Sequence, residues 1–295
     1  MARGRRGKGA APLFRRMAVV GVGLIGGSLA AACRKRGLVE TLVGFDADGG
    51  ALQEALALGL VDEAARDAAA AAAGADVVVL AAPVGALEAL AAAIAPALAP
   101  AALVTDVGSV KGDLVRRLEA RLPAGRYVPA HPIAGRERSG PAAASATLFE
   151  DARCVLTPTP RTDRQALARI RRLWEGVGAV VELMDPEEHD DIFAAVSHLP
   201  HAVAYALMNA MLDLQADGRD VLPYSAGGLR DFTRVAASDP TMWRDIFLAN
   251  RPALLDALRR FRAALARLEA ALAAGDDAAL WAECDRARRV RRDLL

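Results

Sequence analysis

Residues 17–26 read Met-Ala-Val-Val-Gly-Val-Gly-Leu-Ile-Gly, and Asp46 follows the last of these glycines by twenty residues. An apolar run precedes this G-x-G-x-x-G loop, a helical pattern follows it, and the acidic residue stands at the spacing expected after a second strand. Gly21 permits the tight turn, Gly23 lets the backbone approach a pyrophosphate, and Gly26 lets the helix pack closely on the strand. A glycine-rich turn that binds nothing is the alternative interpretation. Strand, turn, helix and acid nevertheless occur in the order that predicts a dinucleotide site at a helix N-terminus.

The expected cofactor is NAD rather than NADP. The Asp46 carboxylate can bond the ribose 2′-hydroxyl and would repel a 2′-phosphate. Asp48 adds to that repulsion, and no arginine follows Asp46 immediately. The predicted cofactor-binding residues are Gly21, Gly23, Leu24, Ile25, Gly26, Asp46 and Pro83. No metal site is expected, because the three cysteines form no C-x-x-C pair and the histidine pair His198/His201 supplies too few ligands.

Strand and helix patterns alternate through the first two thirds of the chain. The expected strands are 17–22, 41–46, 76–81, 102–105, 127–129, 154–157 and 179–183. The expected helices between them are 26–36, 51–58, 84–94, 111–121 and 164–176. This βα alternation predicts an α/β fold with a Rossmann-type doubly wound sheet.

After Met184 the strand signal ends, and the patterns are helical as far as Leu295. Asp185-Pro186 is typical of a helix start, with aspartate as the cap and proline at the first helical position. We therefore expect a dinucleotide-binding domain at 17–184 and an all-helical domain for substrate binding and dimerisation at 185–295. The amphipathic stretch 253–273 suits either a dimer contact or an ordinary bundle helix within one subunit.

Composition excludes several classes of protein. The formal net charge of +1 gives no bulk argument for a nucleic-acid partner. The three dispersed cysteines indicate reduced thiols in a cytosolic protein rather than a disulfide framework. The alanine-rich run 81–104 is interrupted by three prolines and Glu88, so no membrane span is expected.

The first sixteen residues are rich in arginine and glycine. A nucleic-acid arm or a transit peptide is one interpretation of this segment, and a disordered basic extension is the one that we favour. Met17 would then stand at the start of the first strand.

Several polar residues follow predicted strands and would reach the ligand-binding edge of the sheet. Ser109 and Lys111 follow the strand 102–105, and His131 begins the segment His-Pro-Ile-Ala-Gly at 131–135. The carboxyl ends of such strands form the ligand crevice. A histidine base, a serine that orients it and an arginine that clamps a carboxylate suit the oxidation of an alcohol, because hydride leaves the carbinol carbon only as the hydroxyl loses its proton.

Each of these residues also has a purely structural interpretation. His131 before a proline is equally suited to a turn, and His198 and His201 to a packed core or interface. Arg234 could be an ordinary ion-pair partner in an arginine-rich chain, and Lys111 could simply be solvated.

Six segments occur together in an order that resembles one enzyme family. They are Gly-Val-Gly-Leu-Ile-Gly-Gly-Ser-Leu-Ala at 21–30, Thr-Asp-Val-Gly-Ser-Val-Lys at 105–111, His-Pro-Ile-Ala-Gly-x-Glu-x-Ser-Gly at 131–140, Asp-Pro-Glu-Glu-His-Asp at 185–190, Ser-His-Leu-Pro-His at 197–201 and Arg-Asp-Phe-Thr-Arg at 230–234. Over about residues 17–243 the chain resembles the prephenate or arogenate (cyclohexadienyl) dehydrogenases of tyrosine biosynthesis.

The resemblance implies NAD-dependent oxidative decarboxylation of prephenate, arogenate or both by a homodimer. A cytoplasmic location, without nucleic-acid or membrane partners, is what the composition leads us to expect. It implies that His131 accepts the proton of the ring hydroxyl, that Ser109 hydrogen-bonds this hydroxyl, and that Arg234 binds the side-chain carboxylate. It further implies that His198 and His201 shape the substrate pocket. Glu137 would help to gate that pocket, and Trp243 would line it.

Two other functions remain open from the residues alone. A 3-hydroxyacid or 6-phosphogluconate-type dehydrogenase shares the expected architecture but relies on a lysine in the helical domain, and no lysine follows Lys111. A non-catalytic NAD-sensing protein would lack acid–base groups, whereas His131, Ser109 and Arg234 are all present.

Overall fold

The computed structural model describes residues 11–136 and 138–294, and its contacts divide the chain into two compact units. The first unit comprises the described residues up to Phe193 together with Ala237–Asn250. The second comprises Ala194–Ala236 and the described residues from Arg251 onwards. All strands of the described chain lie in the first unit.

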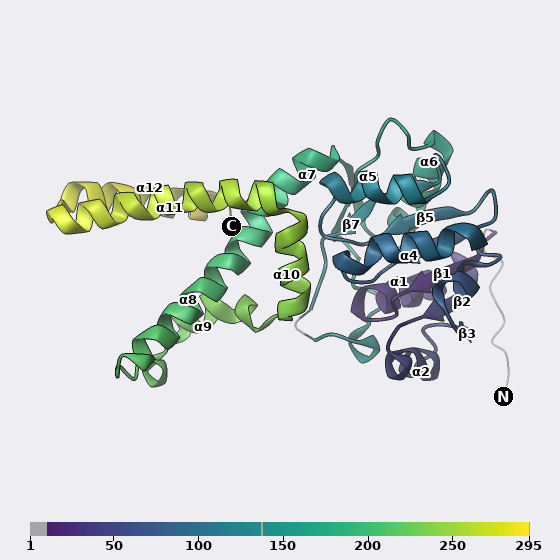
Figure 1. Ribbon diagram of the computed structural model, residues 1–295, viewed down its shortest axis with the longest axis horizontal. Coiled ribbons are helices and arrows are strands. Elements are labelled where there is room, and N and C mark those ends of the chain that lie inside the picture. The colour runs from purple at the N-terminus through teal and green to yellow at the C-terminus, as the bar shows by residue number, and fades with distance from the viewer. Residues whose placement is uncertain (1–10, 137, 295) are drawn as a thin grey trace. The chain divides into compact units, whose positions relative to one another are not determined.

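Six parallel strands form the main sheet of the first unit (Figure 1). They are β1 (Phe14–Val20), β2 (Val39–Phe45), β3 (Glu63–Ala64), β4 (Val77–Leu80), β5 (Leu103–Asp106) and β6 (Tyr127–Val128). Their spatial order β3-β2-β1-β4-β5-β6 is that of a doubly wound dinucleotide-binding sheet, which confirms the predicted fold class. The strand order reverses between β1 and β4, so the ligand crevice is expected beyond the carboxyl ends of these two strands.

The central strands are apolar because helices cover the sheet on both faces. Every residue of β4 is buried, and Met17–Val20 of β1 pairs in register with Val77–Leu80. The helices of this unit are α1 (Leu24–Lys35), α2 (Gly49–Ala57), α3 (Ala68–Ala72), α4 (Leu87–Ile94), α5 (Gly112–Arg121), α6 (Arg164–Gly176), α7 (Pro186–Phe193) and α10 (Pro240–Ala249). Short 3₁₀ turns occur at Val84–Ala86, Ala95–Ala97 and Pro141–Ala143.

Three further strands leave the main sheet and form a second one. β7 (Ala130–Pro132) pairs antiparallel with β8 (Arg153–Leu156), which pairs parallel with β9 (Val180–Leu183). The sequence predicts strands at 154–157 and 179–183, where β8 and β9 lie, but it predicts neither a strand at 130–132 nor a second sheet. Pro129 lies between β6 and β7 and has no N–H with which to continue the ladder, while its carbonyl accepts a hydrogen bond from the Thr157 amide.

A single apolar core joins the two sheets and their helices. It includes Phe14 and Met17 of β1, Val79 of β4, Cys154 of β8 and Trp174 of α6. The Trp174 ring meets Phe149 edge to face, with ring centroids 5.3 Å apart.

The first strand begins at Phe14, before the predicted Met17, so the prediction that residues 1–16 lie outside the fold is wrong for Phe14–Arg16. The amides of Arg15 and Arg16 donate hydrogen bonds to the Asp76 carboxylate, and the Phe14 ring is buried beneath the Arg169 guanidinium. These contacts join residues far apart in the sequence, which no local pattern indicates. Residues 1–10 lie outside the described part of the chain.

The helix predicted to start at Asp185-Pro186 is present as α7. Oδ1 of Asp185 accepts hydrogen bonds from the amides of Glu187 and Glu188, as an N-cap does. The predicted domain boundary near Asp185 nevertheless differs from the division by contacts, because α7 and α10 pack in the first unit. Oδ1 of Asp190 accepts a hydrogen bond from the Lys111 amide, and Nδ2 of Asn250 donates one to the Asp190 carbonyl.

The described residues of the second unit form helices joined by turns and loops, without a strand. A π-helical turn at Ala194–His198 leads into α8 (Leu199–Ala216), which is followed by α9 (Gly227–Thr233), α11 (Arg251–Ala274) and α12 (Asp277–Leu294). Short 3₁₀ turns lie at Leu222–Tyr224 and Arg234–Ala237. Helices α11 and α12 run side by side, joined by an ion pair between Arg267 and Glu283 (Figure 1).

Within residues 11–136 and 138–294, no helix combines the length and the apolar composition that a membrane span requires. The same residues contain no group of three or more histidine, cysteine, aspartate or glutamate side chains placed to hold a metal ion.

Candidate active site

The glycine loop at the end of β1 has the conformation that its sequence predicts. Gly21 has a φ of +100°, and a Cβ on it would lie 2.3 Å from the carbonyl oxygen of Ala81, which follows β4. A Cβ on Gly26 would lie 1.9 Å from the carbonyl oxygen of Gly21. Only glycine allows this turn and this close packing of α1 on the strands.

The N-terminus of α1 can receive an anion. Within the described structure, a Cβ on Gly23 would meet no atom within 4 Å, so the backbone at this N-cap borders open space. The first turn of α1 carries neither a side-chain cap nor an acidic residue in the described chain. Its backbone N–H groups are therefore suited to hold a pyrophosphate.

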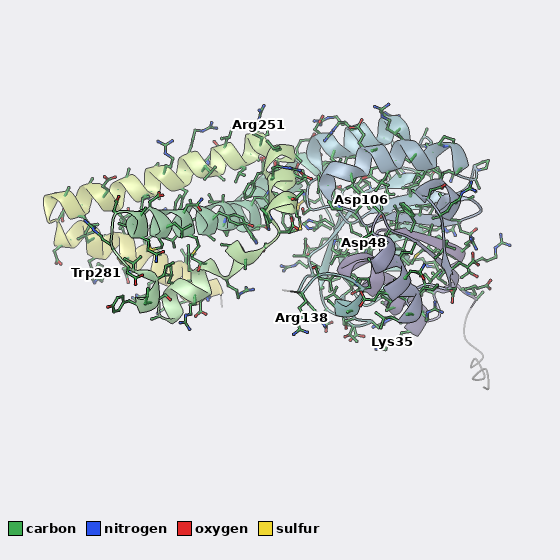
Figure 2. The ribbon with its side chains drawn as sticks, turned by 60° about the horizontal axis from the view of Figure 1, so that its bottom comes forward. Lys35, Asp48, Asp106, Arg138, Arg251 and Trp281 are labelled. Atoms are coloured by element: carbon green, nitrogen blue, oxygen red, sulfur yellow. The ribbon has the colours of Figure 1, made fainter. Side chains whose placement is uncertain are left out.

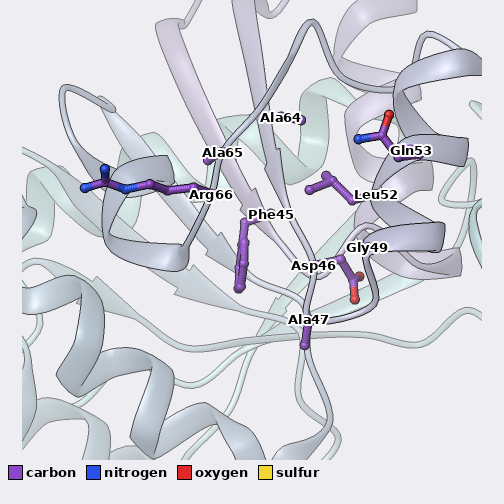
Figure 3. Close-up of a pocket in the computed structure, with 9 residues that line it drawn as sticks. All are labelled: Phe45, Asp46, Ala47, Gly49, Leu52, Gln53, Ala64, Ala65 and Arg66. Atoms are coloured by element: carbon purple, nitrogen blue, oxygen red, sulfur yellow. The ribbon is translucent and has the colours of Figure 1, made fainter.

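Asp46, which follows β2, is hydrogen-bonded to the glycine loop that follows β1. One carboxylate oxygen accepts a hydrogen bond of 2.9 Å from the Val22 amide, and the other accepts one of 3.0 Å from the Asp48 amide. Asp46 also lines a pocket of about 510 Å³ beyond β2 and β3, together with Phe45, Ala47, Gly49, Leu52, Gln53, Ala64, Ala65 and Arg66 (Figure 3). The glycine turn, the open backbone at Gly23 and the half-buried carboxylate fit a dinucleotide.

The Ser109 turn folds around a buried carboxylate. Asp106, at the end of β5, is fully buried within the first unit (Figure 2). Its Oδ2 accepts hydrogen bonds from the Gly108 amide at 2.9 Å and from the Lys111 ammonium at 2.5 Å. Lys111 is itself 0% exposed, so the expectation that it could be solvated is wrong: its charge belongs to an internal ion pair. Half-buried Ser109 lies within the turn that these bonds close.

The same carboxylate holds the segment that carries His131. Oδ1 of Asp106 accepts hydrogen bonds from the Tyr127 hydroxyl at 2.9 Å and from the Ala130 amide at 3.1 Å. Burial, together with the Asp106 charge, raises the pKa of Tyr127 well above its usual value, so the hydroxyl remains a donor. One side chain thus ties the Ser109 turn to the residue that precedes His131.

His131 lies in β7 and contacts a second histidine. Its Nδ1 is 2.8 Å from Nε2 of His189, and Nδ1 of His189 is 2.9 Å from Oδ1 of Asp190. Both imidazoles pack against the Phe193 ring, with centroids 4.8 and 4.4 Å away. Burial lowers the pKa of His189, and the Lys111 charge acts in the same direction, while Asp190 opposes both.

The predicted substrate residues His198, His201 and Arg234 belong to the second unit. His198 is buried at the end of the π-helical turn. The Nδ1–H of His201 donates a hydrogen bond of 2.8 Å to the Ser197 carbonyl. Burial lowers the pKa of His201, and the positive charge of Arg234 lowers it further. The structure therefore places His201 within electrostatic reach of Arg234.

The remaining predicted residues are placed as follows. Trp243 is buried in α10 of the first unit, where its ring packs on Phe247 at 5.5 Å. Pro83 is exposed just before the 3₁₀ turn that follows β4, and Leu24 and Ile25 are half-buried in the first turn of α1. Glu137 lies outside the described residues.

Sequence reasoning assigned no role to Asp106, Tyr127, His189 or Asp190. Three of them lie in the six segments that carry the family resemblance: Asp106 in 105–111, and His189 and Asp190 in 185–190. Their position in those segments could have indicated that they are functional. The sequence could not have indicated their partners, because the contacts join residues up to 79 positions apart.

The fold and this site together define the class: a dinucleotide-binding α/β protein with a histidine in the segment that follows the last strand of its parallel sheet. Residues 29–183 match the family model described as prephenate dehydrogenase, nucleotide-binding domain. Residues 185–284 match that described as prephenate dehydrogenase, dimerization domain. The chain therefore belongs to the prephenate/arogenate dehydrogenase family and is an oxidoreductase.

Curated relatives and solved structures agree with the family. The chain is 42% identical to a cyclohexadienyl dehydrogenase of Zymomonas mobilis subsp. mobilis over 90% of each chain. It is 38% identical to a prephenate dehydrogenase of Bacillus subtilis over 81% of this chain and 65% of that one. The structure of prephenate dehydrogenase from A. aeolicus in complex with hydroxyphenyl propionate and NAD+ superposes with a TM-score of 0.90 at 38% identity, covering 95% of this chain and 98% of that one. Synechocystis arogenate dehydrogenase gives a TM-score of 0.79 at 31% identity, covering 95% and 100%.

Proposed function

We propose that this enzyme oxidises and decarboxylates prephenate, arogenate or both, with NAD as the hydride acceptor, as a step of tyrosine biosynthesis in the cytoplasm. The observation that carries the proposal is the double role of Asp106. This carboxylate holds both the Ser109 turn and the strand of His131, in the unit that also contains the glycine loop. A hydroxyl donor and a histidine base are thereby fixed to one scaffold.

In this proposal His131 removes the proton from the ring hydroxyl while Ser109 hydrogen-bonds the same oxygen. Bound NAD would accept the hydride from the carbinol carbon. As the ketone forms, the bond to the ring carboxylate breaks and its electron pair enters the ring, so carbon dioxide leaves and the ring becomes aromatic. The proton held by His131 then returns to the phenolic oxygen. The protein's own contribution is positioning and proton transfer.

Arg234, His198 and His201 would bind the substrate. A guanidinium can hold a carboxylate through two parallel hydrogen bonds. The positive charge of Arg234, which contributes to the lowered pKa of His201, supports a pocket that binds an anionic group. Trp243 would line this pocket and Glu137 would help to gate it, as the family resemblance implies.

NAD is proposed over NADP because of Asp46. Its carboxylate is anchored by two amides at the end of β2 and lines the neighbouring pocket (Figure 3). A 2′-phosphate near this charge would be repelled. The NAD+ named in the A. aeolicus complex supports the same choice.

A homodimer through the helical unit is part of the proposal. The match to a dimerization-domain family model supports it. So do exposed apolar side chains on α11 and α12: Leu265, Leu272 and Trp281 are 53%, 66% and 65% exposed. Trp281 of α12 is labelled in Figure 2. Exposed apolar surface of this kind is typical of an interface between subunits.

The test is to follow formation of the reduced nicotinamide by the full chain with prephenate and with arogenate, each with NAD and with NADP. We expect turnover with at least one substrate and a higher kcat/KM with NAD. No turnover in any of the four combinations, by a folded protein that binds NAD, would contradict the proposed reaction. Sedimentation velocity of the same sample tests the dimer, and a monomer at micromolar concentration would contradict it.

A further inference from the structure

The contacts of His131 define which of its two nitrogens carries the proton. The line of contacts starts at Asp190, whose carboxylate oxygen only accepts hydrogen bonds. Oδ1 of Asp190 is 2.9 Å from Nδ1 of His189, so this nitrogen of His189 is the N–H donor. In a neutral imidazole the other nitrogen is then an acceptor. That nitrogen, Nε2 of His189, is 2.8 Å from Nδ1 of His131.

We propose that His189, oriented by Asp190, is a positioning residue that fixes His131 as the Nδ1–H tautomer and thereby makes Nε2 of His131 the basic atom. His131 donates its Nδ1–H to His189 and keeps its lone pair on Nε2. The role of that lone pair in proton removal rests on the proposed function, whereas the tautomer itself does not. If the proton of His131 were on Nε2 instead, this nitrogen would have no free lone pair and could not accept the proton of the substrate.

His189 acts in this way only while it is neutral. A protonated His189 would donate from both nitrogens, and His131 would then have to accept at Nδ1 and carry its own proton on Nε2. The charged and titratable groups that face His189 are Asp190 of α7, Lys111 before α5, Asp106 of β5 and His131 of β7. His189 is 0% exposed, and burial keeps its pKa below the ordinary value for histidine, so the neutral form prevails at pH 7.

Asp190 is held firmly enough to serve as the fixed end of this arrangement. Its Oδ1 also accepts the Lys111 amide at 2.7 Å, and its backbone carbonyl accepts Nδ2 of Asn250 at 2.7 Å. A Cβ on Gly112 would lie 2.7 Å from Oδ2 of Asp190, so the carboxylate occupies space that only glycine leaves. The Phe193 ring packs against both imidazoles and limits their rotation. All of these residues belong to the first unit.

The experiment is imidazole nitrogen NMR of the uniformly ¹⁵N-labelled full chain at pH 7.5, combined with steady-state kinetics. The chain has four histidines, so each ring is assigned by single substitution, with His131→Asn identifying the His131 signals. We expect a protonated Nδ1 and an unprotonated Nε2 for His131. A protonated Nε2 in the unaltered protein would overturn the proposal directly.

Two substitutions of His189 distinguish a role in positioning His131 from a role in packing alone. His189→Phe retains a ring but cannot accept a hydrogen bond, so we expect the Nε2–H tautomer of His131 to appear. We also expect kcat to fall by about 10²- to 10⁴-fold with KM and the NAD dissociation constant little changed. His189→Gln offers a carbonyl oxygen near the position of Nε2, so it should retain the Nδ1–H tautomer and most of kcat. Equal losses in both variants with an unchanged tautomer would show that His189 is merely structural.

Gly112→Ala provides a test that leaves both histidines in place if His189→Phe does not fold. The added methyl displaces the Asp190 carboxylate, so we expect the Nδ1–H signal of His131 to weaken and kcat to fall. An unchanged tautomer in this variant would overturn the role of Asp190. If the unaltered protein shows the expected tautomer but turns over neither substrate, the proposed function fails while the tautomer assignment stands.

Discussion

The ammonium of Lys111 lies 2.5 Å from the carboxylate of Asp106, and both side chains are entirely buried. The two residues are five positions apart and lie at the two ends of the turn that contains Ser109. The carboxylate also receives the Tyr127 hydroxyl and the Ala130 amide. Isolated burial of either charge would be strongly unfavourable, so the pair and its hydrogen bonds form or break together.

Asp106→Asn should therefore destabilise the fold far more than loss of an exposed ion pair. The substitution leaves the buried Lys111 ammonium without its counter-charge, at a free-energy cost of about 3–5 kcal/mol. Glu88→Gln is the matched control, because Glu88 pairs at the surface with Arg117 and Arg121 and its loss should cost about 0–1 kcal/mol. Urea unfolding measures both free energies. Equal effects of the two substitutions would contradict the coupled arrangement.

The sequence predicted local features well because their causes are local. The Gly21 turn and the Asp185 cap each follow from residues a few positions apart. The second sheet and the contacts of Asp106, His189 and Asp190 were not predicted. They depend on which distant segments meet, as where His131 meets His189 across 58 positions. Alternating strand and helix patterns indicate the βα order of the first unit, but they do not reveal the short strands β3 and β7 or the pairing of β7 with β8.

Deleting residues 1–16 should destabilise the protein, because β1 begins at Phe14. The deletion removes the buried Phe14 ring and the Arg16–Glu63 ion pair from the strand. Loss of a buried phenylalanine side chain alone costs about 3–5 kcal/mol. Deleting only residues 1–10 leaves every residue of β1 in place and is the control. The free energy of unfolding in urea distinguishes the two, and equal stabilities of both shortened chains would contradict the placement of Phe14 in the core.

Stability should fall as the pH drops below about 6.5, because two histidines have lowered pKa values in the folded protein. Burial lowers the pKa of His189 and His201 in the folded protein, whereas in the unfolded chain each titrates near its ordinary value of about 6.5. Below pH 6.5 the unfolded state binds more protons, so the free energy of unfolding decreases as the pH falls toward the lowered folded values. About one pH unit or more above 6.5, both states are largely neutral at these positions and the effect is nearly absent.

The slope in this window is at most about 1.4 kcal/mol per pH unit for each histidine. His189→Gln removes one titrating group, so its free energy of unfolding should change less between pH 7.5 and pH 5.5 than that of the unaltered protein. Urea unfolding at the two pH values measures the difference. An identical pH dependence in the variant would mean that His189 titrates alike in the folded and unfolded chains.

Asp46→Asn should shift cofactor preference toward NADP. Removing the charge ends the repulsion of a 2′-phosphate and weakens the acceptor for the ribose hydroxyl, so the ratio of the two dissociation constants should change by roughly tenfold or more, about 1.4 kcal/mol. Calorimetric titration without substrate measures both constants independently of turnover. Asp62→Asn is the control, because Asp62 bonds the Leu42 amide and Arg34 and does not contact the glycine loop through its described hydrogen bonds. A ratio that changes equally in both variants would exclude Asp46 as the selective residue.

Arg234→Gln should raise KM for the substrate and leave kcat nearly unchanged. A guanidinium that holds a carboxylate in both the ground state and the transition state contributes uniform binding, and a charge-assisted hydrogen-bonded pair is worth about 1.5–3 kcal/mol. KM should therefore rise by about 10- to 100-fold. Arg219→Gln, at an exposed arginine just beyond α8 in the same unit, is the control and should leave both constants as they are. Because Arg234 also lowers the pKa of His201, its removal should raise that pKa, which the imidazole signals of His201 report without substrate. A variant that loses kcat at constant KM would place Arg234 in the chemical step instead of in substrate binding.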